Sequence, residues 1–282
     1  MLGQYLIAFR EALEAALITA IILSYLRRRS RHILVRYVWY GIFVSIIASL
    51  SLGAVVWFTY DALPETLKLL YEAVSAFVAV IVLSSMIYWM AVKGRSIREE
   101  MEKRVETATS RGAIISLAFL GFIVVFREGF ETVLFLTPFL LTDAIVTLAG
   151  MSLGILTAVL LAYGIFVVGM KINLKKFFYF TSIMLILLAG GLAGYGTHEL
   201  LEYYEETGFN IGWLSEPAYT LSIPANSPFH HRGVIGAIFS VMFGYTVSAE
   251  WIRIIVHLSY LAIMFPLVIW VYRKKLILLN FE

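Results

Sequence analysis

Two short charged motifs interrupt the apolar stretches of this chain, and they constrain its fold more than any other feature. Residues 10–14 read Arg-Glu-Ala-Leu-Glu, and residues 127–131, which lie 117 positions later, read Arg-Glu-Gly-Phe-Glu. A charged side chain at the centre of a bilayer costs about 2.5 to 3.5 kcal/mol on insertion scales. Two arginines and four glutamates inside apolar runs therefore indicate a function that requires them.

The composition is that of an integral membrane protein. Of the 282 residues, 61% are hydrophobic and 15% are charged, and the mean hydropathy of +0.87 lies far above that of soluble domains. The net charge of +3 is explained by topology, and the chain offers no soluble basic domain that would bind nucleic acid. Because cysteine is absent, metal ligands must be oxygen atoms or a few imidazoles.

Seven apolar runs are long enough to cross a membrane as helices, since about 20 residues span the hydrocarbon. Four basic segments, at residues 27–36, 93–111, 171–176 and 273–275, hold 17 of the 22 Lys and Arg residues and alternate with segments that hold almost none. By the positive-inside rule, the amino terminus is outside and the carboxyl terminus inside. The predicted spans are roughly 2–26, 37–59, 72–92, 112–141, 144–169, 178–198 and 251–272.

The predicted fold is an all-α integral membrane protein with a three-plus-three inverted repeat and a seventh helix. Each motif falls in the first helix of a three-helix unit, and because three is odd, the second unit enters the membrane from the opposite side. The expected domains are residues 1–111 with a cytosolic loop, residues 112–201, an extracytoplasmic loop at 202–250, and residues 251–282 with a basic tail. The loop's apolar piece, 233–247, is short for a crossing, which favours a re-entrant or interfacial segment.

The two motifs predict one shared cation site. At 100° per residue Arg10, Glu14 and Glu11 project from one side of a helix, and the second motif repeats this arrangement. Four carboxylates and two guanidiniums carry a formal charge of −2, and carboxylates are hard donors that suit hard cations. The predicted ligands are Glu11, Glu14, Glu128 and Glu131, with Arg10 and Arg127 holding the carboxylates in place.

A simpler interpretation is that each arginine forms an ion pair with the glutamate four positions later and only fastens helices together. Arginine before glutamate is the weaker orientation for such a pair. One pair also leaves the second glutamate of each motif without a purpose, and the motif occurs twice. These points favour the metal site.

The paired motifs resemble those of the high-affinity iron permease family, which includes the oxidase-dependent fungal permeases and their prokaryotic relatives. The similarity extends to residues 86–90, 198–200 and 244–246, and so covers nearly the whole chain. The resemblance implies import of iron, as Fe³⁺ or Fe²⁺, across the cell membrane, with the motif glutamates as its ligands. It implies no enzymatic activity and no cofactor. An extracytoplasmic ferroxidase or iron-delivery protein is the expected partner, and homo-oligomer formation stays open.

Four further residues form a candidate site for capturing iron outside the membrane: Glu72, His198, Glu199 and Glu202. The alternatives are a solvated acidic loop and, for Glu72, capping of a helix end. Other functions also stay open. The chain could carry Mn²⁺, Pb²⁺ or another divalent ion, it could be a purely structural subunit, or it could be a membrane di-iron oxidoreductase, although such enzymes usually contain Glu-x-x-His pairs that neither motif offers.

Overall fold

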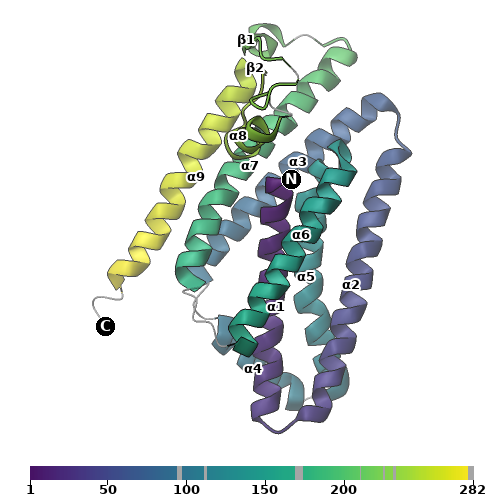
Figure 1. The fold of residues 1–282 in the computed structure, drawn as a ribbon, viewed down its shortest axis with the longest axis vertical. Helices are drawn as coiled ribbons and strands as arrows, with labels where there is room; N and C mark the ends of the chain where they lie inside the picture. The colour runs from purple at the N-terminus through teal and green to yellow at the C-terminus, as the bar shows by residue number, and fades with distance from the viewer. Residues whose placement is uncertain are drawn as a thin grey trace. The chain divides into compact units, whose positions relative to one another are not determined.

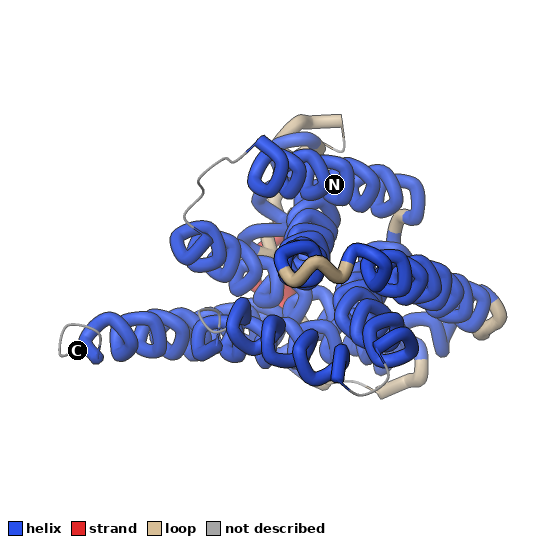
Figure 2. The backbone as a smooth tube through the Cα atoms, turned by 90° about the horizontal axis from the view of Figure 1, so that it is seen from below, coloured by secondary structure: helices blue, strands red, loops and turns tan. Residues whose placement is uncertain are grey.

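The computed structural model describes residues 1–93, 97–110, 113–168, 174–209, 211–224, 226–230 and 233–278. Helices make up most of the described chain, and strands are limited to two short segments (Figures 1 and 2). The elements are α1 (Leu2–Arg28), α2 (His32–Asp61), α3 (Glu65–Lys93), α4 (Ile97–Ser110), α5 (Ala113–Thr142), α6 (Ala144–Tyr163), a π-helical turn η1 (Gly164–Val168), α7 (Leu174–Glu206), a 3₁₀ turn η2 (Gly212–Ser215), β1 (Pro217–Thr220), α8 (Val234–Phe243), β2 (Ser248–Glu250) and α9 (Trp251–Leu278).

Each of the seven predicted apolar runs lies in a helix, but several helices are longer than their apolar runs. The second helix begins at His32 rather than near residue 37, the third at Glu65 rather than near 72, and α7 continues to Glu206 rather than ending near 198. Hydropathy marks where a chain meets lipid, whereas backbone hydrogen bonding continues into the polar segments on either side. The helical membrane fold is therefore confirmed, with wider helix boundaries.

Five of the described helices are long and apolar enough to cross a membrane. These spans are His32–Asp61, Glu65–Met90, Ala144–Phe166, Tyr179–Glu206 and Trp251–Val271. Helices α1 and α5 are comparably long, with 27 and 30 residues, but each contains the three charged side chains of a motif. The chain is thus a multi-helix membrane protein, and the seven-span topology stays a prediction.

The chain divides into two compact units. The first contains residues 3–58 and 93–175, and the second contains residues 59–92 and 176–282. The first and second helices of both predicted repeats, α1, α2, α5 and α6, fall in the first unit together with α4. The second unit groups the third helices, α3 and α7, with α9, α8 and the two strands.

Close helix contacts hold the first unit together. Gly41 of α2 lies against the backbone of Ala118 on α5, and Gly121 of α5 lies against the backbone of Val38 on α2. Neither site has room for a side chain, so the two helices approach closely. Apolar residues from α1, α2, α4 and α5 fill the core at the basic end of the unit, among them Ile22, Leu26, Val38, Met101, Val105 and Leu117.

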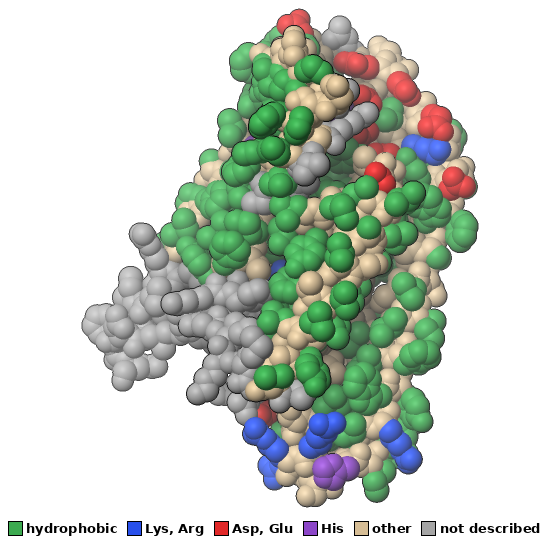
Figure 3. Space-filling model, viewed as in Figure 1, with side chains coloured by type: hydrophobic (Ala, Val, Ile, Leu, Met, Phe, Trp, Pro, Cys, Tyr) green, Lys and Arg blue, Asp and Glu red, His purple; other side chains and the backbone are tan. Residues whose placement is uncertain are grey.

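The surface of the first unit is apolar along its length and basic at one end. Hydrophobic side chains cover the outer faces of α2 and α6, and Lys and Arg side chains gather where α1 joins α2 (Figure 3). Of the other predicted basic segments, α4 covers much of 93–111. Residues 94–96, 111–112 and 171–173, and the side chains of 273–275, lie outside the described part of the chain.

In the second unit, glycines of α7 allow contact with two neighbouring helices. Gly196 faces Ala73 and Ala76 on α3, whereas Gly190 faces Leu261 and His257 on α9. At one end of this unit β1 pairs with β2 in antiparallel register, a pairing that the sequence analysis did not anticipate. Helix α8, with ten residues, is too short to cross a bilayer, and its re-entrant or interfacial placement stays a prediction.

Candidate metal site

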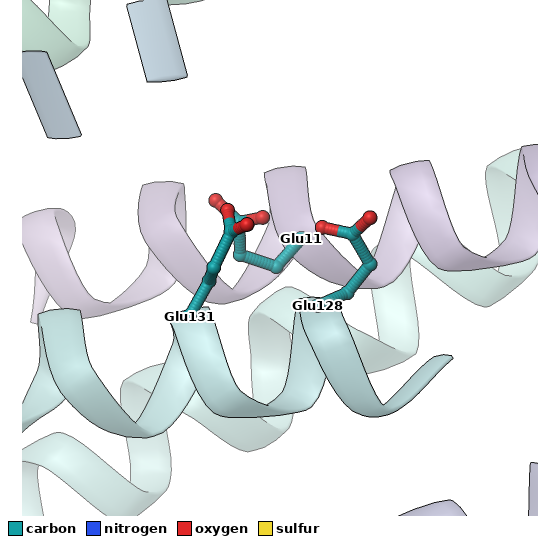
Figure 4. A group of neighbouring side chains, drawn as sticks. All are labelled: Glu11, Glu128 and Glu131. Carbon is teal, nitrogen blue, oxygen red and sulfur yellow. The ribbon is translucent and has the colours of Figure 1, made fainter. Parts of the chain in front are cut away.

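The two charged motifs lie side by side in the first unit, one on α1 and one on α5 (Figure 4). Their burial is unusually deep for charged groups. Arg10, Glu11, Glu14 and Glu128 expose only 2%, 1%, 3% and 2% of their surface. The helical period explains this placement, since residues three and four apart share a face. In the second motif the side chain of Arg127 is 44% exposed, so only in the first motif are all three charged side chains buried.

Three carboxylates from the two helices converge. Glu11, Glu128 and Glu131 each offer an oxygen atom, and these atoms all lie within 4.8 Å of one another. The carboxylates of Glu11 and Glu131 point toward one another, and Glu128 approaches from the next turn of α5 (Figure 4). Because the three atoms lie within 4.8 Å of one another, some point lies within about 2.8 Å of all three. Carboxylate oxygens lie about 2.0 to 2.6 Å from divalent cations, so this spacing is close to that of a candidate metal site.

Each arginine pairs most closely with the glutamate that follows it directly. Arg10 Nη1 lies 2.5 Å from Glu11 Oε1, and Arg127 Nη2 lies 2.6 Å from Glu128 Oε1. The pairs at spacing four are longer, at 3.3 Å from Arg10 Nη2 to Glu14 Oε2 and 3.6 Å from Arg127 Nε to Glu131 Oε1. The arginines therefore hold one oxygen of each neighbouring glutamate.

The arrangement separates Glu14 from the other three predicted ligands. Its Oε2 atom faces Arg10, and its Oε1 atom lies 3.5 Å from Nη2 of Arg127 on the opposite helix. Glu14 is thus engaged by both arginines and is not one of the three carboxylates that converge. The structure therefore brings all four glutamates close together. Three of them converge on one another, whereas Glu14 faces the two arginines.

Two buried oxygen atoms of the cluster lack a hydrogen-bond partner among the described residues. They are Oε2 of Glu11 and Oε2 of Glu128. An unsatisfied polar atom in a buried place costs about 1 to 3 kcal/mol, and more if charged, so a purely fastening role for these glutamates explains the arrangement poorly. A bound cation would satisfy both atoms.

Helix α2 packs against the second motif at a contact that sequence reasoning missed. Gly129, inside the second motif, lies directly against the side chain of Ser49, and a Cβ atom there would overlap it. The nearby Ser45 is fully buried, and its hydroxyl has no hydrogen-bond partner in the described chain. The available signal was two serines four residues apart in an otherwise apolar run.

The predicted capture residues lie in the second unit. Both Tyr60 and Tyr195 donate hydrogen bonds to the carboxylate of Glu72. Tyr195 also hydrogen-bonds Glu199, whose carboxylate is close enough to Glu72 to repel it. The structure therefore brings Glu72 and Glu199 together through Tyr195, which the sequence did not mark as a site residue.

His198 connects the remaining acidic side chains of this region. Its Nε2 atom lies 3.2 Å from Glu202 Oε1, and its Nδ1 atom lies 3.0 Å from Glu250 Oε1. Burial tends to raise the pKa of Glu250, but the hydrogen bond with His198, a backbone hydrogen bond and the charges of His198 and Arg253 together leave that pKa below the ordinary value of 4.5. Glu250 was not among the predicted site residues, because its partner lies 52 positions away.

The fold and the site together define a class: a multi-pass helical membrane protein with a buried, anionic cluster of oxygen donors. Residues 1–271 match the model of the iron permease FTR1 family. The chain belongs to this family and is an iron permease, a transporter rather than an enzyme.

Relatives cover nearly the whole chain. A protein of Archaeoglobus fulgidus described as uncharacterized is 43% identical over 268 residues, which are 95% of this chain and 94% of that protein. The ferrous iron permease EfeU of Yersinia pestis is 32% identical over 93% of this chain and 90% of its own length. EfeU of Escherichia coli O6:K15:H31 is 31% identical, with coverage of 93% and 92%. No solved structure matches the chain.

Proposed function

We propose that iron crosses the membrane through a carboxylate site formed by Glu11, Glu128 and Glu131. The observation that carries this proposal is the convergence of three ligand atoms within 4.8 Å in a member of an iron permease family. Hard oxygen donors from two helices bind a hard cation without the help of thiolates, which this chain lacks. The two unpartnered carboxylate oxygens are the atoms that would coordinate iron first.

Arg10 and Arg127 act as positioning residues in this proposal. Each fixes one oxygen of the adjacent glutamate and leaves the second oxygen free for the metal. Glu14, which lies between both guanidiniums, holds the arginines away from the ion path and becomes a fourth ligand only when they move. Such outer contacts orient metal ligands and tune their basicity.

Fe²⁺ is the form that best fits the site. With all six groups ionised, the motif charge of −2 becomes zero when a divalent ion binds. The relatives from Yersinia and Escherichia are named ferrous iron permeases. Uptake of Fe²⁺ kept reduced by ascorbate should therefore exceed uptake of Fe³⁺ supplied as citrate.

The proposed topology has seven spans, with the amino terminus outside and an inverted repeat. Helices α1 and α5 have spanning length, and most of their charged side chains, Arg10, Glu11, Glu14 and Glu128, are buried in the protein rather than facing lipid. Because the chain has no cysteine, single substitutions report sidedness directly. Ser30→Cys should be protected from an impermeant maleimide in intact cells, and Ser215→Cys should react; the reverse pattern would refute this topology.

The acidic residues of the second unit are proposed to capture iron before permeation. Glu72 and Glu199 would bind the ion, and the carboxylate of Glu202, beside His198, would add negative charge to the region. Delivery by an extracytoplasmic ferroxidase or iron-binding protein would end at this cluster.

The central experiment measures uptake of radioactive iron by the protein reconstituted in vesicles. Glu128→Gln keeps the shape of the side chain but removes a negative charge and a ligand, so uptake should fall to background. Glu106→Gln, an exposed position on α4 of the same unit, is the matched control and should transport normally. Normal uptake by Glu128→Gln would remove this site from the mechanism.

Carboxylate oxygens also bind Mn²⁺ and other hard divalent ions, which makes a broader selectivity the second candidate. Competition in the same vesicles distinguishes the two. If a tenfold excess of Mn²⁺ leaves iron uptake unchanged, the site selects iron, whereas strong inhibition accompanied by Mn²⁺ uptake would favour a general divalent carrier.

A further inference from the structure

The second unit contains a cavity that the iron path does not use. Its volume is about 380 Å³, and it lies between α7, α9, the carboxyl end of α8 and the two strands. Most of its lining is apolar, including Phe243, Leu258 and Leu261. Two basic side chains of α9, Arg253 and His257, also line it, one helical turn apart.

Each of the two basic side chains has one buried nitrogen atom without a hydrogen-bond partner among the described residues. His257 exposes only 9% of its surface, and its Nδ1 atom makes no hydrogen bond with any described residue. The Nε atom of Arg253 is also buried and also makes no hydrogen bond with any described residue. By contrast, the hydroxyls of Tyr219 and Tyr245, which also line the cavity, already bond to backbone carbonyls. The unsatisfied polar atoms of the cavity lining are therefore those of the arginine and the histidine.

Three glycines leave space for these two side chains, because a Cβ atom at each would lie close to one of them. A Cβ atom at Gly244, whose φ of +64° is left-handed, would lie 3.0 Å from His257 Nδ1, and one at Gly190 would lie 3.3 Å from the same atom. A Cβ at Gly194 would come within 3.5 Å of Arg253 Cγ. The backbone of α7 and of the α8 end is thus shaped around the two basic groups.

The charge of Arg253 determines the kind of ligand. A guanidinium is permanently charged, and an apolar environment makes such a charge costly unless an anion pairs with it. Glu250 and Glu199 lie close enough to attract Arg253. Glu250 nevertheless hydrogen-bonds His198, and the Nε atom of Arg253 has no hydrogen-bond partner among the described residues. A metal ion beside the guanidinium would be repelled, so the free donor atoms of this cavity suit an anion rather than iron.

The exposed apolar residues at the cavity indicate that the ligand also has an apolar part. Phe243 and Leu258 line the cavity and are also 52% and 57% exposed. They belong to the apolar surface around α9, which is one of the five candidate membrane spans. A ligand that enters between them comes from the hydrocarbon of the membrane and carries acyl chains.

We propose that this cavity binds an anionic phospholipid, with its phosphate on Arg253 and His257 and an acyl chain along Leu258 and Leu261. The planar guanidinium presents a pair of N–H donors that matches two phosphate oxygens. The imidazole donates a third hydrogen bond from Nδ1. The lipid would hold α9 against α7 and α8 in the second unit.

The test measures lipid retained by the intact protein after delipidation in detergent and addition of defined lipids, using native mass spectrometry. The probes are dioleoylphosphatidylglycerol, dioleoylphosphatidylcholine, oleate and inorganic phosphate. The wild-type protein should retain one phosphatidylglycerol in preference to phosphatidylcholine, and millimolar phosphate should not displace it. Arg253→Gln should weaken retention roughly 30-fold or more, as removal of one partner of a buried charge pair does.

Two further variants separate this site from general attraction of anionic lipid. Arg36→Gln removes an exposed arginine outside the cavity and should retain the lipid as wild type does. His257→Gln should weaken retention less than Arg253→Gln. If Arg253→Gln does not fold, lipid retention by Arg253→Lys replaces it. The rise in melting temperature of the wild type on addition of each lipid then compares phosphatidylglycerol with phosphatidylcholine independently. Equal retention of both phospholipids, preference for oleate, displacement by phosphate or full retention by Arg253→Gln would each overturn the proposal.

Discussion

Arg127 on α5 reaches Glu14 on α1, with 3.5 Å between Nη2 of the arginine and Oε1 of the glutamate. Arg10 faces the other oxygen of the same carboxylate. One glutamate is therefore shared by the arginines of both motifs, while Glu11, Glu128 and Glu131 converge beside it. This asymmetry divides the four glutamates into groups that mutation can distinguish.

Metal affinity should respond differently to the two groups. Glu11→Gln removes a ligand with an unpartnered oxygen and should abolish measurable iron binding. Glu14→Gln disturbs only the orientation of the arginines and should weaken binding by about 10- to 100-fold. Isothermal titration with Fe²⁺ under nitrogen measures both. Equal loss in the two variants would mean that Glu14 is itself a ligand.

Stability should depend more on Arg10 than on Arg127. The side chain of Arg10 is 2% exposed and sits between two buried carboxylates, whereas that of Arg127 is 44% exposed. Removing one partner from a buried ion pair costs about 3 to 5 kcal/mol, and solvent reduces this cost at exposed pairs. Arg10→Gln should therefore lower the melting temperature in detergent well below that of Arg127→Gln. The opposite order would contradict the described burial.

The contact between α2 and α5 should not tolerate a side chain at position 129. Gly129→Ala places a methyl group against Ser49 and should cost about 1 to 3 kcal/mol as overpacking. Gly53→Ala is the matched control on α2, because its methyl group would lie 3.7 Å from Val133 in ordinary contact. Ser49→Gly should restore part of the loss in the double variant. Additive effects of the two changes would exclude this contact as the cause.

Acid should destabilise the second unit through Glu250. Burial tends to raise its pKa, but the hydrogen bond with His198, a backbone hydrogen bond and the charges of His198 and Arg253 together lower it in the folded protein. The stabilisation is therefore complete above the ordinary value of 4.5 and is lost as the pH falls below it. Glu250→Gln should flatten the fall of melting temperature between about pH 5.5 and 3.5. A parallel fall in both proteins would argue against this role.

Capture residues should affect apparent affinity for iron rather than maximal rate. Glu199→Gln removes a carboxylate beside Glu72, and Tyr195→Phe removes a hydrogen bond to it. Both should raise the KM for uptake in vesicles and leave kcat nearly unchanged. Asp143→Asn, which alters an exposed acidic residue that caps α6, should leave KM unchanged. A fall in kcat for Glu199→Gln would place it in the permeation step instead.

The helices and the partnership of the two motifs were predictable because both depend on short-range periodicity. A run of apolar residues determines where a helix meets lipid, and a spacing of one and four places Arg10, Glu11 and Glu14 on one side. Burial of the charged faces against each other then follows from the cost of exposing them to hydrocarbon.

What the sequence did not predict depends on contacts between distant segments. The engagement of Glu14 by Arg127 requires the relative height of two helices to within a few ångströms, which a count of residues does not provide. The hydrogen bonds of Tyr60 and Tyr195 to Glu72 likewise join separate helices. The pairing of β1 with β2 joins segments separated by the whole of α8, a distance in sequence at which local patterns carry no signal of strand pairing.

The contact of Gly129 with Ser49 also bears on how the two motifs relate. The first motif has Ala12 at the matching position, and an alanine in α5 would meet the side chain of Ser49. The two copies are therefore not interchangeable parts, even though their charged residues are identical. A protein in which the first motif replaced the second would keep every charge of the site, but α5 would no longer pack closely against Ser49 of α2.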